Sequence, residues 1–397
     1  MTILYLADIR FPLERANGVH TMETCASLAE RGHDVHLLVR PDTVAPARDP
    51  FEYYGVPATP RLRVERVPVC GPPPLRRAGY LAWMTLRLLQ RGCWSAVYTP
   101  NLLLASAALC LPAWLRPPVV FESHNFSPSF ARAAAALETG ARAAGPCKLR
   151  RLERRERRVW RGAEGYVTTT RVLAGELRER FGARSHAATA PNAVRLDRVR
   201  AWSPPRRDGA PVVAYAGSLH PYKGADLLVE ALACVPGVRG LVIGGHPRDA
   251  ADRDRLNALA RDRGIAERVR FTGLVPPAEV LELLRGADVL VLPLRDMPHT
   301  RYDSPMKLFE YLAVGRPIVA SDLLSTREIF VDGTTARLFE AGNPAALAAA
   351  VRAVLADPES ADRMGRAAFD AAADYTWARR AERIERLLDD VFEEARA

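Results

Sequence analysis

Long hydrophobic runs are missing from this sequence of 397 residues. The most apolar stretch, residues 102–115, is too short to span a bilayer and contains Pro112. We expect it to form a buried helix instead. The chain enters a strand-like apolar segment directly, without a charged region followed by a long apolar run. The sequence therefore predicts neither a transmembrane helix nor a signal peptide.

Cysteine is also scarce, and no two cysteines lie close together or at metal-ligand spacing. The six are Cys25, Cys70, Cys93, Cys110, Cys147 and Cys234. We therefore expect a reduced, cytoplasmic protein. Seven histidines form no ligand spacing either, so we expect no structural metal. These are His20, His33, His36, His186, His220, His246 and His299.

Acidic residues are outnumbered, with 46 Asp and Glu against 56 Lys and Arg, which gives a net charge of +10. This excess favours anionic ligands, nucleic acid or an anionic membrane surface without choosing among them. Hydrophobic residues make up 48% of the chain, which is enough for a large core. The length predicts two domains of just under 200 residues each.

Short apolar runs, for example the strands predicted at residues 96–99 and 269–273, alternate with amphipathic helices along the whole chain, which is the pattern of doubly wound α/β sheets. The segment 197–210 breaks this rhythm with adjacent prolines and no periodicity, and we interpret it as a linker. We predict a first domain over residues 1–197, a second over 198–375 and a terminal helix over 376–397. Pro-rich segments around residues 41–60 and 68–74 are predicted as loops.

The segment DSPMKLFEYLAVGRPIVASD, residues 303–322, predicts a loop, a helix and a buried strand. Ser304 is a good N-cap and Pro305 suits the first helical turn. Met306, Phe309, Leu312 and Ala313 fall on one helical face, which we expect to pack, while Lys307, Glu310 and Tyr311 fall on another, which we expect to be open. A helix N-terminus followed by a lysine and a glutamate suits a phosphate and a sugar hydroxyl. A surface ion pair is the plainer alternative.

A second segment, YAGSLHPYKGADLLVEAL, places a strand, the turn at Gly217 and Ser218, Lys223 and a helix start in that order. Glycine lets the backbone approach a ligand closely, and the lysine can supply a cation to a phosphate. Lys223 and the Ser304 region both follow strands of one predicted parallel sheet. Ligands bind at the carboxyl ends of such strands, so we expect both to face one crevice.

Together, these two segments, separated by VIGG and VRFTGLV, resemble the retaining nucleotide-sugar glycosyltransferases of family four, which have the GT-B fold. The likeness covers nearly the whole second domain. It is looser in the first domain, where it rests on a Gly-containing loop, SLAERGHDVHLLV, FESHNF and GAEGYVTTT, then on PNAVRLDRV at the hinge. The terminal TWARRAERI resembles the family's last helix. The resemblance implies two Rossmann-like domains facing a central crevice, with the last helix crossing back to the first domain.

The resemblance also implies roles for single residues, with a nucleoside diphosphate sugar as donor. Glu310 would bind the ribose hydroxyls, Lys223 would neutralise the diphosphate, and the backbone of Ser304, Pro305 and Met306 would cradle it. Phe271, Thr272 and Gly273 align with the loop that holds the base. Gly18 aligns with a glycine that lets the first domain's loop close over the phosphates. His124 aligns with a histidine near the transferred sugar, and Asn192 lies at the hinge motif.

Two positions depart from the family pattern. Tyr302, with Asp303 beside it, stands where members often carry a glutamate next to the donor sugar. Ser218 stands where they often carry a basic residue, so Lys307 would share the diphosphate with Lys223. The resemblance implies transfer with retention, without a metal or other cofactor, in which the leaving diphosphate takes the acceptor's proton. The acceptor is unknown. A nucleotide-sugar 2-epimerase and a non-catalytic membrane- or polyanion-binding protein are the alternatives.

The densest charge run, residues 150–161, predicts either a solvated helix with Glu153 and Glu156 interleaved or a peripheral membrane contact. In the membrane interpretation an apolar stripe comes from Leu149, Leu152, Val159 and Trp160, and the protein lies at the inner face of a membrane. No nucleic-acid motif accompanies the run, so we expect no nucleic-acid partner. Asp252 and Asp254 lie two apart in a predicted surface helix, where they share no face and cannot hold a metal together.

Overall fold

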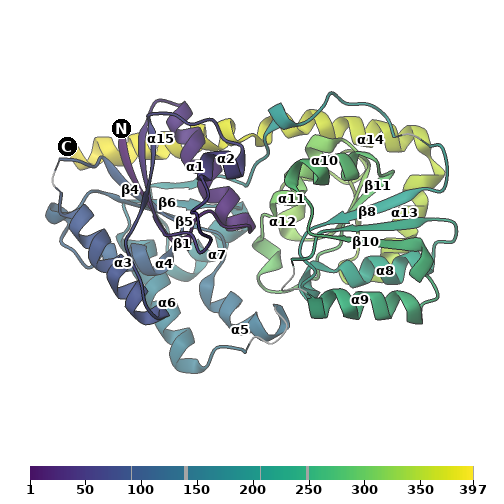
Figure 1. Ribbon diagram of the computed structural model, residues 1–397, viewed down its shortest axis with the longest axis horizontal. Helices are drawn as coiled ribbons and strands as arrows, with labels where there is room; N and C mark the ends of the chain where they lie inside the picture. Colours follow the sequence, from purple (N-terminus) through teal and green to yellow (C-terminus); the bar gives the residue numbers. More distant parts are fainter. Residues whose placement is uncertain (91, 138–141, 206, 247–249, 397) are drawn as a thin grey trace. The chain divides into compact units, whose positions relative to one another are not determined.

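Two parallel sheets organise the chain in the computed structural model, which describes all residues except 91, 138–141, 206, 247–249 and 397 (Figure 1). The chain divides into two compact units. The first contains Met1–Pro128, Pro146–Asn192 and Trp377–Ala397, and the second contains Ser129–Gly145 and Ala193–Thr376. Among the described residues, every helix is either too short or too polar to cross a bilayer.

The first unit is built on a sheet of seven strands that all pair in parallel. In spatial order they are β3 (Leu62–Arg66), β2 (Asp34–Arg40), β1 (Thr2–Arg10), β4 (Ala96–Thr99), β5 (Val119–Ser123), β6 (Gly165–Thr168) and β7 (Ala187–Thr189). Parallel strands are covered on both faces, and the inner strands are accordingly continuous apolar runs. The strand order reverses between β1 and β4, which is where doubly wound sheets bind ligands.

Helices cover both faces of the first sheet. In Figure 1, α1 (Ala16–Glu30) and α15 (Trp377–Arg396) lie on one side, and α3 (Pro73–Leu88), α4 (Leu102–Ala108) and α6 (Pro146–Gly162) lie on the other. The shorter helices of this part of the chain are α2 (Pro50–Tyr54) and α7 (Arg171–Phe181). Helix α5 (Ser127–Leu137) begins in the first unit and continues into the second. The last helix of the chain thus packs on the first unit.

The second unit repeats the design with six parallel strands. In spatial order they are β10 (Val269–Gly273), β9 (Arg239–Ile243), β8 (Val212–Ala216), β11 (Val289–Leu292), β12 (Ile318–Ser321) and β13 (Arg337–Phe339). One apolar cluster holds α8 (Ala225–Ala233), α9 (Ala250–Asp262) and α13 (Pro344–Ala356) against the sheet. Another holds α10 (Pro277–Arg285), α11 (Met306–Val314) and α14 (Pro358–Ala371). A short helix, α12 (Leu324–Arg327), follows β12.

The α/β alternation predicted from the sequence is confirmed, but the Pro-rich part of the first unit is not a plain loop region. The predicted loop at residues 41–60 contains the short helix α2, and the predicted loop at 68–74 leads into the helix α3, which starts at Pro73 because proline fits the first helical turn. The apolar stretch 102–115 forms the short helix α4 and the 3-10 turn η1 (Ala113–Leu115), and Trp114 in this turn is 73% exposed. The prediction of one buried helix there is therefore wrong in its second half.

Helix α11 differs from its prediction at its start and on its faces. Its N-cap is Pro305, not Ser304, and no side chain caps it. The helix is buried nearly all round, including Lys307 and Tyr311 on the face expected to be open. Tyr311 faces the sheet because its hydroxyl accepts a hydrogen bond from the Ala216 amide at 2.7 Å. Only Glu310 and Met306 keep partial exposure, so the open part of the helix is narrow.

Candidate functional site

The carboxyl ends of three neighbouring strands in the second unit meet through glycines. The Gly244 amide, after β9, donates to the Gly273 carbonyl at 3.0 Å, and a Cβ on Gly244 would lie 2.5 Å from the Gly217 carbonyl oxygen. Gly217 itself follows β8 with φ of +141°, which side chains rarely allow. These glycines therefore leave the edge of the sheet free of side chains, and we call it the bare backbone edge. A ligand can approach its main-chain groups closely.

Lys223 lies at this edge, in the short 3-10 turn η3 (Pro221–Lys223), and is paired with Asp303. Its Nζ donates to Oδ2 of Asp303 at 2.9 Å and lies 4.5 Å from the centre of the Tyr222 ring. Burial opposes the charge on Lys223, yet Asp303 outweighs it and the pKa of the lysine is raised. Lys223 is therefore a fixed cation. The strands β8 and β11 that precede the two residues belong to one parallel sheet, as the sequence predicted, and they are also adjacent in it.

Lys307, in the first turn of α11, has no such partner. Its Nζ forms no hydrogen bond with any described residue and lies 3.8 Å from the centre of the Tyr215 ring. A Cβ on Gly217 would come within 2.9 Å of this Nζ, so the amine lies directly against the glycine turn. Burial, followed by repulsion from Lys223, holds the pKa of Lys307 well below its usual value. The amine is buried, unpaired and aimed at the bare backbone edge.

Glu310 lies one turn further along α11 and is half-buried. Its carboxylate has no hydrogen bond or ion pair with a described residue in the structure. Burial raises its pKa, and nearby Lys307 counteracts that effect only in part. A carboxylate with free lone pairs can accept from two neighbouring hydroxyls, which is the geometry that a ribose offers.

The remaining residues predicted in the second unit surround these three. Phe271, Thr272 and Gly273 end β10 and are half-buried, with the Thr272 hydroxyl donating to the Gly273 carbonyl at 2.7 Å. Ser218 follows Gly217, and its carbonyl accepts from the Tyr215 hydroxyl at 2.6 Å. Ser304 and Pro305 are buried before α11, and Tyr302 is buried in the turn η6 (Thr300–Tyr302). The predicted residues of this unit thus share one strand edge.

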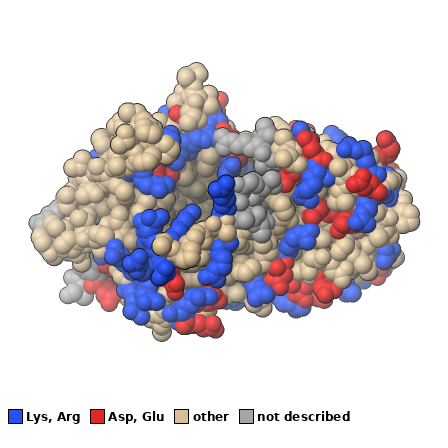
Figure 2. Space-filling model, turned by 90° about the horizontal axis from the view of Figure 1, so that it is seen from below, with Lys and Arg blue, Asp and Glu red and all other residues tan. Residues whose placement is uncertain are grey.

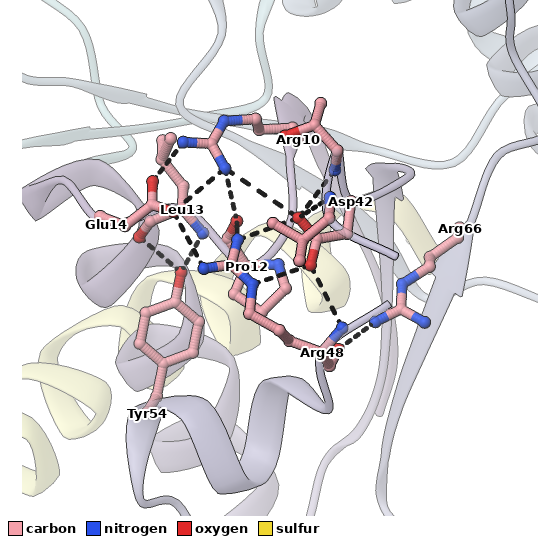
Figure 3. Close-up of polar contacts among 10 residues, drawn as sticks. Arg10, Pro12, Leu13, Glu14, Asp42, Arg48, Tyr54 and Arg66 are labelled. Carbon is pink, nitrogen blue, oxygen red and sulfur yellow. Dashed lines mark hydrogen bonds and ion pairs between the residues drawn. The ribbon is translucent and has the colours of Figure 1, made fainter. Parts of the chain in front are cut away.

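In the first unit, the loop from β1 to α1 is fixed by a network of polar contacts (Figure 3). The Tyr54 hydroxyl accepts from the Leu13 amide at 2.7 Å and donates to the Leu13 carbonyl at 2.8 Å. A Cβ on Gly18 would clash with that carbonyl and that hydroxyl. Glycine is therefore required at position 18 because the loop folds back over it, which is a packing reason that the sequence did not show.

Charged side chains hold the same loop. Arg48 binds Glu14 and Asp42, with both contacts at 2.9 Å, and Arg10 pairs with Glu14 (Figure 3). Burial works against these carboxylates, but hydrogen bonds from Arg10 and Arg48 lower the pKa of Glu14 to about 2. The loop before α1 is consequently built as a rigid element and not as an open flap.

His124 follows β5 and belongs to a buried cluster around Glu122. Nε2 of His124 and Nε2 of His20 each lie 3.0 Å from the same oxygen, Oε1 of Glu122. The guanidinium of Arg380, from α15, contacts that oxygen too, and the Tyr98 hydroxyl donates to Oε2. Burial raises the pKa of Glu122, but Arg380 and the two histidines reverse this and hold the pKa well below its usual value.

His20, Glu122 and His124 together are also the one trio of described residues whose ligand atoms, within 4.8 Å of one another, could hold a metal ion. The Arg380 guanidinium already brings a positive charge to the shared carboxylate oxygen. A metal cation would therefore meet repulsion at the atom it needs most. The donor set fits an ion-pair network better than a metal site.

The basic helix α6 corrects both interpretations of residues 150–161. Val159 and Trp160 are buried in the unit, so they cannot supply an apolar stripe to a membrane. Glu156 is also fully buried and accepts from the Ser127 amide at 3.0 Å, so it does not belong to a solvated face. What remains outside is a row of arginines, and Figure 2 shows basic side chains gathered over this region.

Asp252 is a further correction, because it is 4% exposed although we predicted a surface helix. Oδ2 of Asp252 lies 3.8 Å from Nδ1 of His220. Asp254 is exposed on another side of α9. The two carboxylates therefore share no face, as predicted.

Several residues of these clusters were missed in the sequence. Glu122 had a signal, since it stands two residues before His124 at the end of a strand and so points to the same face. Arg380 and His20 had none, because only the fold brings them to Glu122. His299 was also missed, although it is 4% exposed near Lys223 and burial lowers its pKa to about 4.

The comparisons with known families cover most of the chain. Residues 17–193 match the family described as "Glycosyl transferase 4-like domain", and residues 200–371 match "Glycosyl transferases group 1". Among curated proteins, D-inositol 3-phosphate glycosyltransferase of Nocardia farcinica is 32% identical over 244 residues, which are 57% of this chain and 52% of that protein. The chain spans about half the length of the curated relatives it matches, 42% to 52% for the first three.

Solved structures match over nearly the full chain. Sucrose-phosphate synthase of Thermosynechococcus elongatus has a TM-score of 0.79 at 19% identity, covering 99% of both chains. HepE of Anabaena, solved with UDP-glucose, has a TM-score of 0.74 at 16% identity, covering 98% of this chain and 100% of that one.

Two Rossmann-like units of seven and six parallel strands, with polar residues at the carboxyl ends of their strands, define a GT-B fold. The chain belongs to glycosyltransferase family four, the group 1 glycosyltransferases, which have this fold.

Proposed function

We propose that this protein transfers a sugar from a nucleoside diphosphate sugar to an acceptor hydroxyl, with retention at the anomeric carbon and without a metal. Lys307 and Lys223 would bind the diphosphate, and Glu310 would bind the ribose hydroxyls. The backbone of residues 304–306 and 271–273 would hold phosphate and base. The family membership supports the reaction class, and the contacts at the strand edge support the residue roles.

One observation carries the proposal. Lys148, Lys223 and Lys307 are the only lysines in a chain with 56 basic residues, and two of the three lie at this edge. Arginine cannot lose its proton inside a protein, whereas a buried lysine can. An unpaired buried amine therefore has to be lysine until an anion reaches it. A diphosphate, which carries charge at the right place for both lysines, is such an anion.

The proposed chemistry is attack on the same face as the departing diphosphate. The two lysines would stabilise the charge that develops on the leaving group, which in turn takes the acceptor's proton. His124 would lie beside the transferred sugar. Catalysis would then come mainly from positioning and electrostatics in a fixed site.

Substitution of the two key residues tests the proposal. We expect Lys223→Ala and Glu310→Ala to lose sugar transfer while they stay folded, as circular dichroism would show. Lys148→Ala and Glu267→Ala are the matched controls, since both are exposed side chains away from the edge. Wild-type turnover in either site variant contradicts the residue roles.

The donor and acceptor need a screen. A ligand that binds the folded state raises the melting temperature, so nucleoside diphosphate sugars can be ranked by thermal shift, beginning with UDP-glucose. Inositol phosphates are the first acceptors to try because of the names of the curated relatives. Anomeric analysis by NMR separates retention from inversion. A donor converted without any acceptor would indicate an epimerase instead.

We also propose that α6 brings the protein to the inner face of an anionic membrane. Arg150, Arg154 and Arg157 line a groove of about 570 Å³ on this helix, and Glu153 is the one carboxylate beside them. Each basic residue near an anionic surface contributes about 1 kcal/mol. With Val159 and Trp160 buried, the contact would be electrostatic and not an insertion.

Co-sedimentation with vesicles tests the contact. We expect binding to phosphatidylglycerol vesicles, none to phosphatidylcholine vesicles, and loss of binding in salt. The triple change of Arg150, Arg154 and Arg157 to Gln should weaken it strongly. The same change of Arg253, Arg261 and Arg263, which are exposed on the second unit, is the control. Equal binding by both triple variants would contradict the proposal.

A further inference from the structure

The carboxylate of Glu122 contacts four side chains, which is more than its ion pair with one cation requires. One oxygen meets Nε2 of His20, Nε2 of His124 and the Arg380 guanidinium, and the other accepts from the Tyr98 hydroxyl. The side chain is fully buried. A buried ion pair such as Glu122 with Arg380 can often be replaced by apolar residues without loss of stability. Stability alone therefore does not explain the cluster.

Besides Tyr98 of β4, the partners of Glu122 come from three parts of the first unit. His20 stands in α1 two residues after Gly18, His124 directly follows β5, and Arg380 comes from α15. Arg380 also donates to the Thr24 hydroxyl of α1 at 3.1 Å and stacks at 5.6 Å on the Trp377 ring. The carboxylate thus joins the last helix to the two segments that carry Gly18 and His124.

The two histidines differ in their exposure. His20 is 2% exposed, and burial lowers its pKa to about 4, so it is neutral at pH 7. His124 keeps 32% of its side chain exposed. Nε2 of His124 lies 3.0 Å from Oε1 of Glu122 without completing a hydrogen bond in the structure, but a carboxylate can only accept, so its negative charge favours a proton on the ring nitrogen that faces it. The other nitrogen of His124, Nδ1, is then a lone-pair acceptor on the open side of the ring.

We propose that Glu122 is a positioning residue, which fixes His124 as the tautomer with the proton on Nε2 and presents Nδ1 to a sugar hydroxyl, with Arg380 holding Glu122 in place. His20 is a second support, because its ring packs edge-on against His124 at 4.5 Å. This role deepens the proposed sugar transfer and rests on it. Its physical part, the tautomer of His124, is independent of that function.

The tautomer is measured first, without donor or acceptor. Imidazole ¹⁵N shifts distinguish a protonated nitrogen from a lone-pair nitrogen, and a His124→Gln variant assigns the signals. We expect His124 of the wild type to be protonated at Nε2. The double variant Glu122→Leu with Arg380→Met removes both charges together and so avoids an unpaired buried ion. It should give a mixture of both tautomers.

The sugar-transfer activity and the UDP affinity are measured on the same proteins. Loss of a group that orients a reacting residue typically costs about 10- to 100-fold in activity. We expect this loss in kcat for the double variant and for Glu122→Gln, with UDP affinity within twofold of the wild type, since the nucleotide residues lie in the other unit. Glu156→Gln is the matched control, because Glu156 is also a fully buried glutamate of the first unit. It should keep both kcat and tautomer.

The results distinguish failure of the positioning role from failure of the proposed function. A folded double variant with the wild-type tautomer overturns the positioning role, whatever its activity. A changed tautomer with unchanged kcat also overturns it, since Nδ1 then does nothing in transfer. If the wild type transfers no sugar from any donor, the proposed function fails, and the NMR result still decides whether Glu122 holds His124.

Discussion

The two units treat their buried charges in opposite ways. In the first unit, Glu122 is surrounded by Arg380, two histidines and a tyrosine hydroxyl. In the second, Lys307 is buried against a tyrosine ring and a glycine turn without a hydrogen-bond partner among the described residues. The carboxylate of the first cluster is paired with a guanidinium, whereas the amine of the second has no hydrogen-bond partner among the described residues.

This difference indicates which of the two clusters binds an anionic ligand. The Glu122 carboxylate is held by Arg380 and Tyr98 before substrate arrives, which suits the orientation of a histidine beside it. An amine that is desolvated and unpaired lies in an unfavourable state, which a bound anion relieves. Part of the stabilisation that the second unit gives up is then recovered when a diphosphate binds.

Removing the cation from the first cluster should have the largest effect on stability. Arg380→Met leaves Glu122 buried without its counter-ion, and breaking a buried pair in this way typically costs about 3–5 kcal/mol. Urea denaturation measures the free energy of unfolding. Arg379→Met is the control, since Arg379 is the exposed neighbour on the same helix. A loss below 1 kcal/mol would show that the cluster is not coupled as its contacts indicate.

Glu156 sharpens the comparison, because it is a buried carboxyl of the first unit without a cation. Burial raises its pKa from 4.5 to about 7. The folded state therefore binds more protons than the unfolded state between these values, and stability falls as pH rises through this window. Below pH 4.5 the stability is fully present, and above pH 7 the loss is complete at about 3 kcal/mol.

The variant Glu156→Gln should remove this pH dependence. Urea denaturation measures the free energy of unfolding from pH 5 to pH 8. Over this range we expect the free energy of the variant to change by about 3 kcal/mol less than that of the wild type. Parallel curves for the two proteins would mean that Glu156 is already ionised when folded.

Removing the cation from the second cluster should leave stability alone and weaken binding. Lys307→Met takes away an unpaired buried amine, so we expect no loss in the free energy of unfolding. A charge-assisted hydrogen bond contributes about 1.5–3 kcal/mol, so UDP affinity should fall at least tenfold. Calorimetry measures the affinity, and Lys148→Met is the control. Unchanged UDP affinity would exclude Lys307 from the diphosphate site.

The same variant tests whether UDP binding is coupled to the uptake of a proton by Lys307. Burial holds the pKa of Lys307 low in the free protein, and an adjacent diphosphate raises it, so UDP should bind together with a proton and more weakly as pH rises. Lys223, Asp303 and Glu310 also face this amine. The difference in pH slope between wild type and Lys307→Met isolates its contribution. Heats measured in two buffers of different ionisation enthalpy count the proton directly.

Asp303→Asn should have the smallest effect. The pair with Lys223 is partly exposed, so its loss should cost about 1 kcal/mol or less. Without Asp303, Lys223 has its charge free for phosphate, and we expect UDP to bind slightly more tightly. Weaker binding would mean that Asp303 itself contacts the donor.

The sequence predicted the architecture well because buried parallel strands and helical periodicity are local signals. The strands at residues 96–99 and 269–273 were predicted at their observed bounds. The strand β3 was missed because prolines flank it on both sides. The predicted separation of α11 into a packed face and an open face failed at Tyr311, since a tyrosine hydroxyl can bind a strand end from inside a core.

The site was predictable only where the chain itself brings residues together. Lys307 and Glu310 share a helix, and Lys223 follows the neighbouring strand. That Lys307 lacks a partner is a property of the packed state, which composition does not reveal. The same holds for Arg380, which meets Glu122 across 258 residues of sequence.

That long separation has a consequence for the chain as it is made. Glu122 is synthesised first, and its counter-ion Arg380 follows 258 residues later. Bacterial and eukaryotic ribosomes add about 5–20 residues per second, so the 258 intervening residues take about 13–52 s. During that interval the first unit cannot form this ion pair, because the residues of the second unit lie between its two members in the sequence and are synthesised before Arg380.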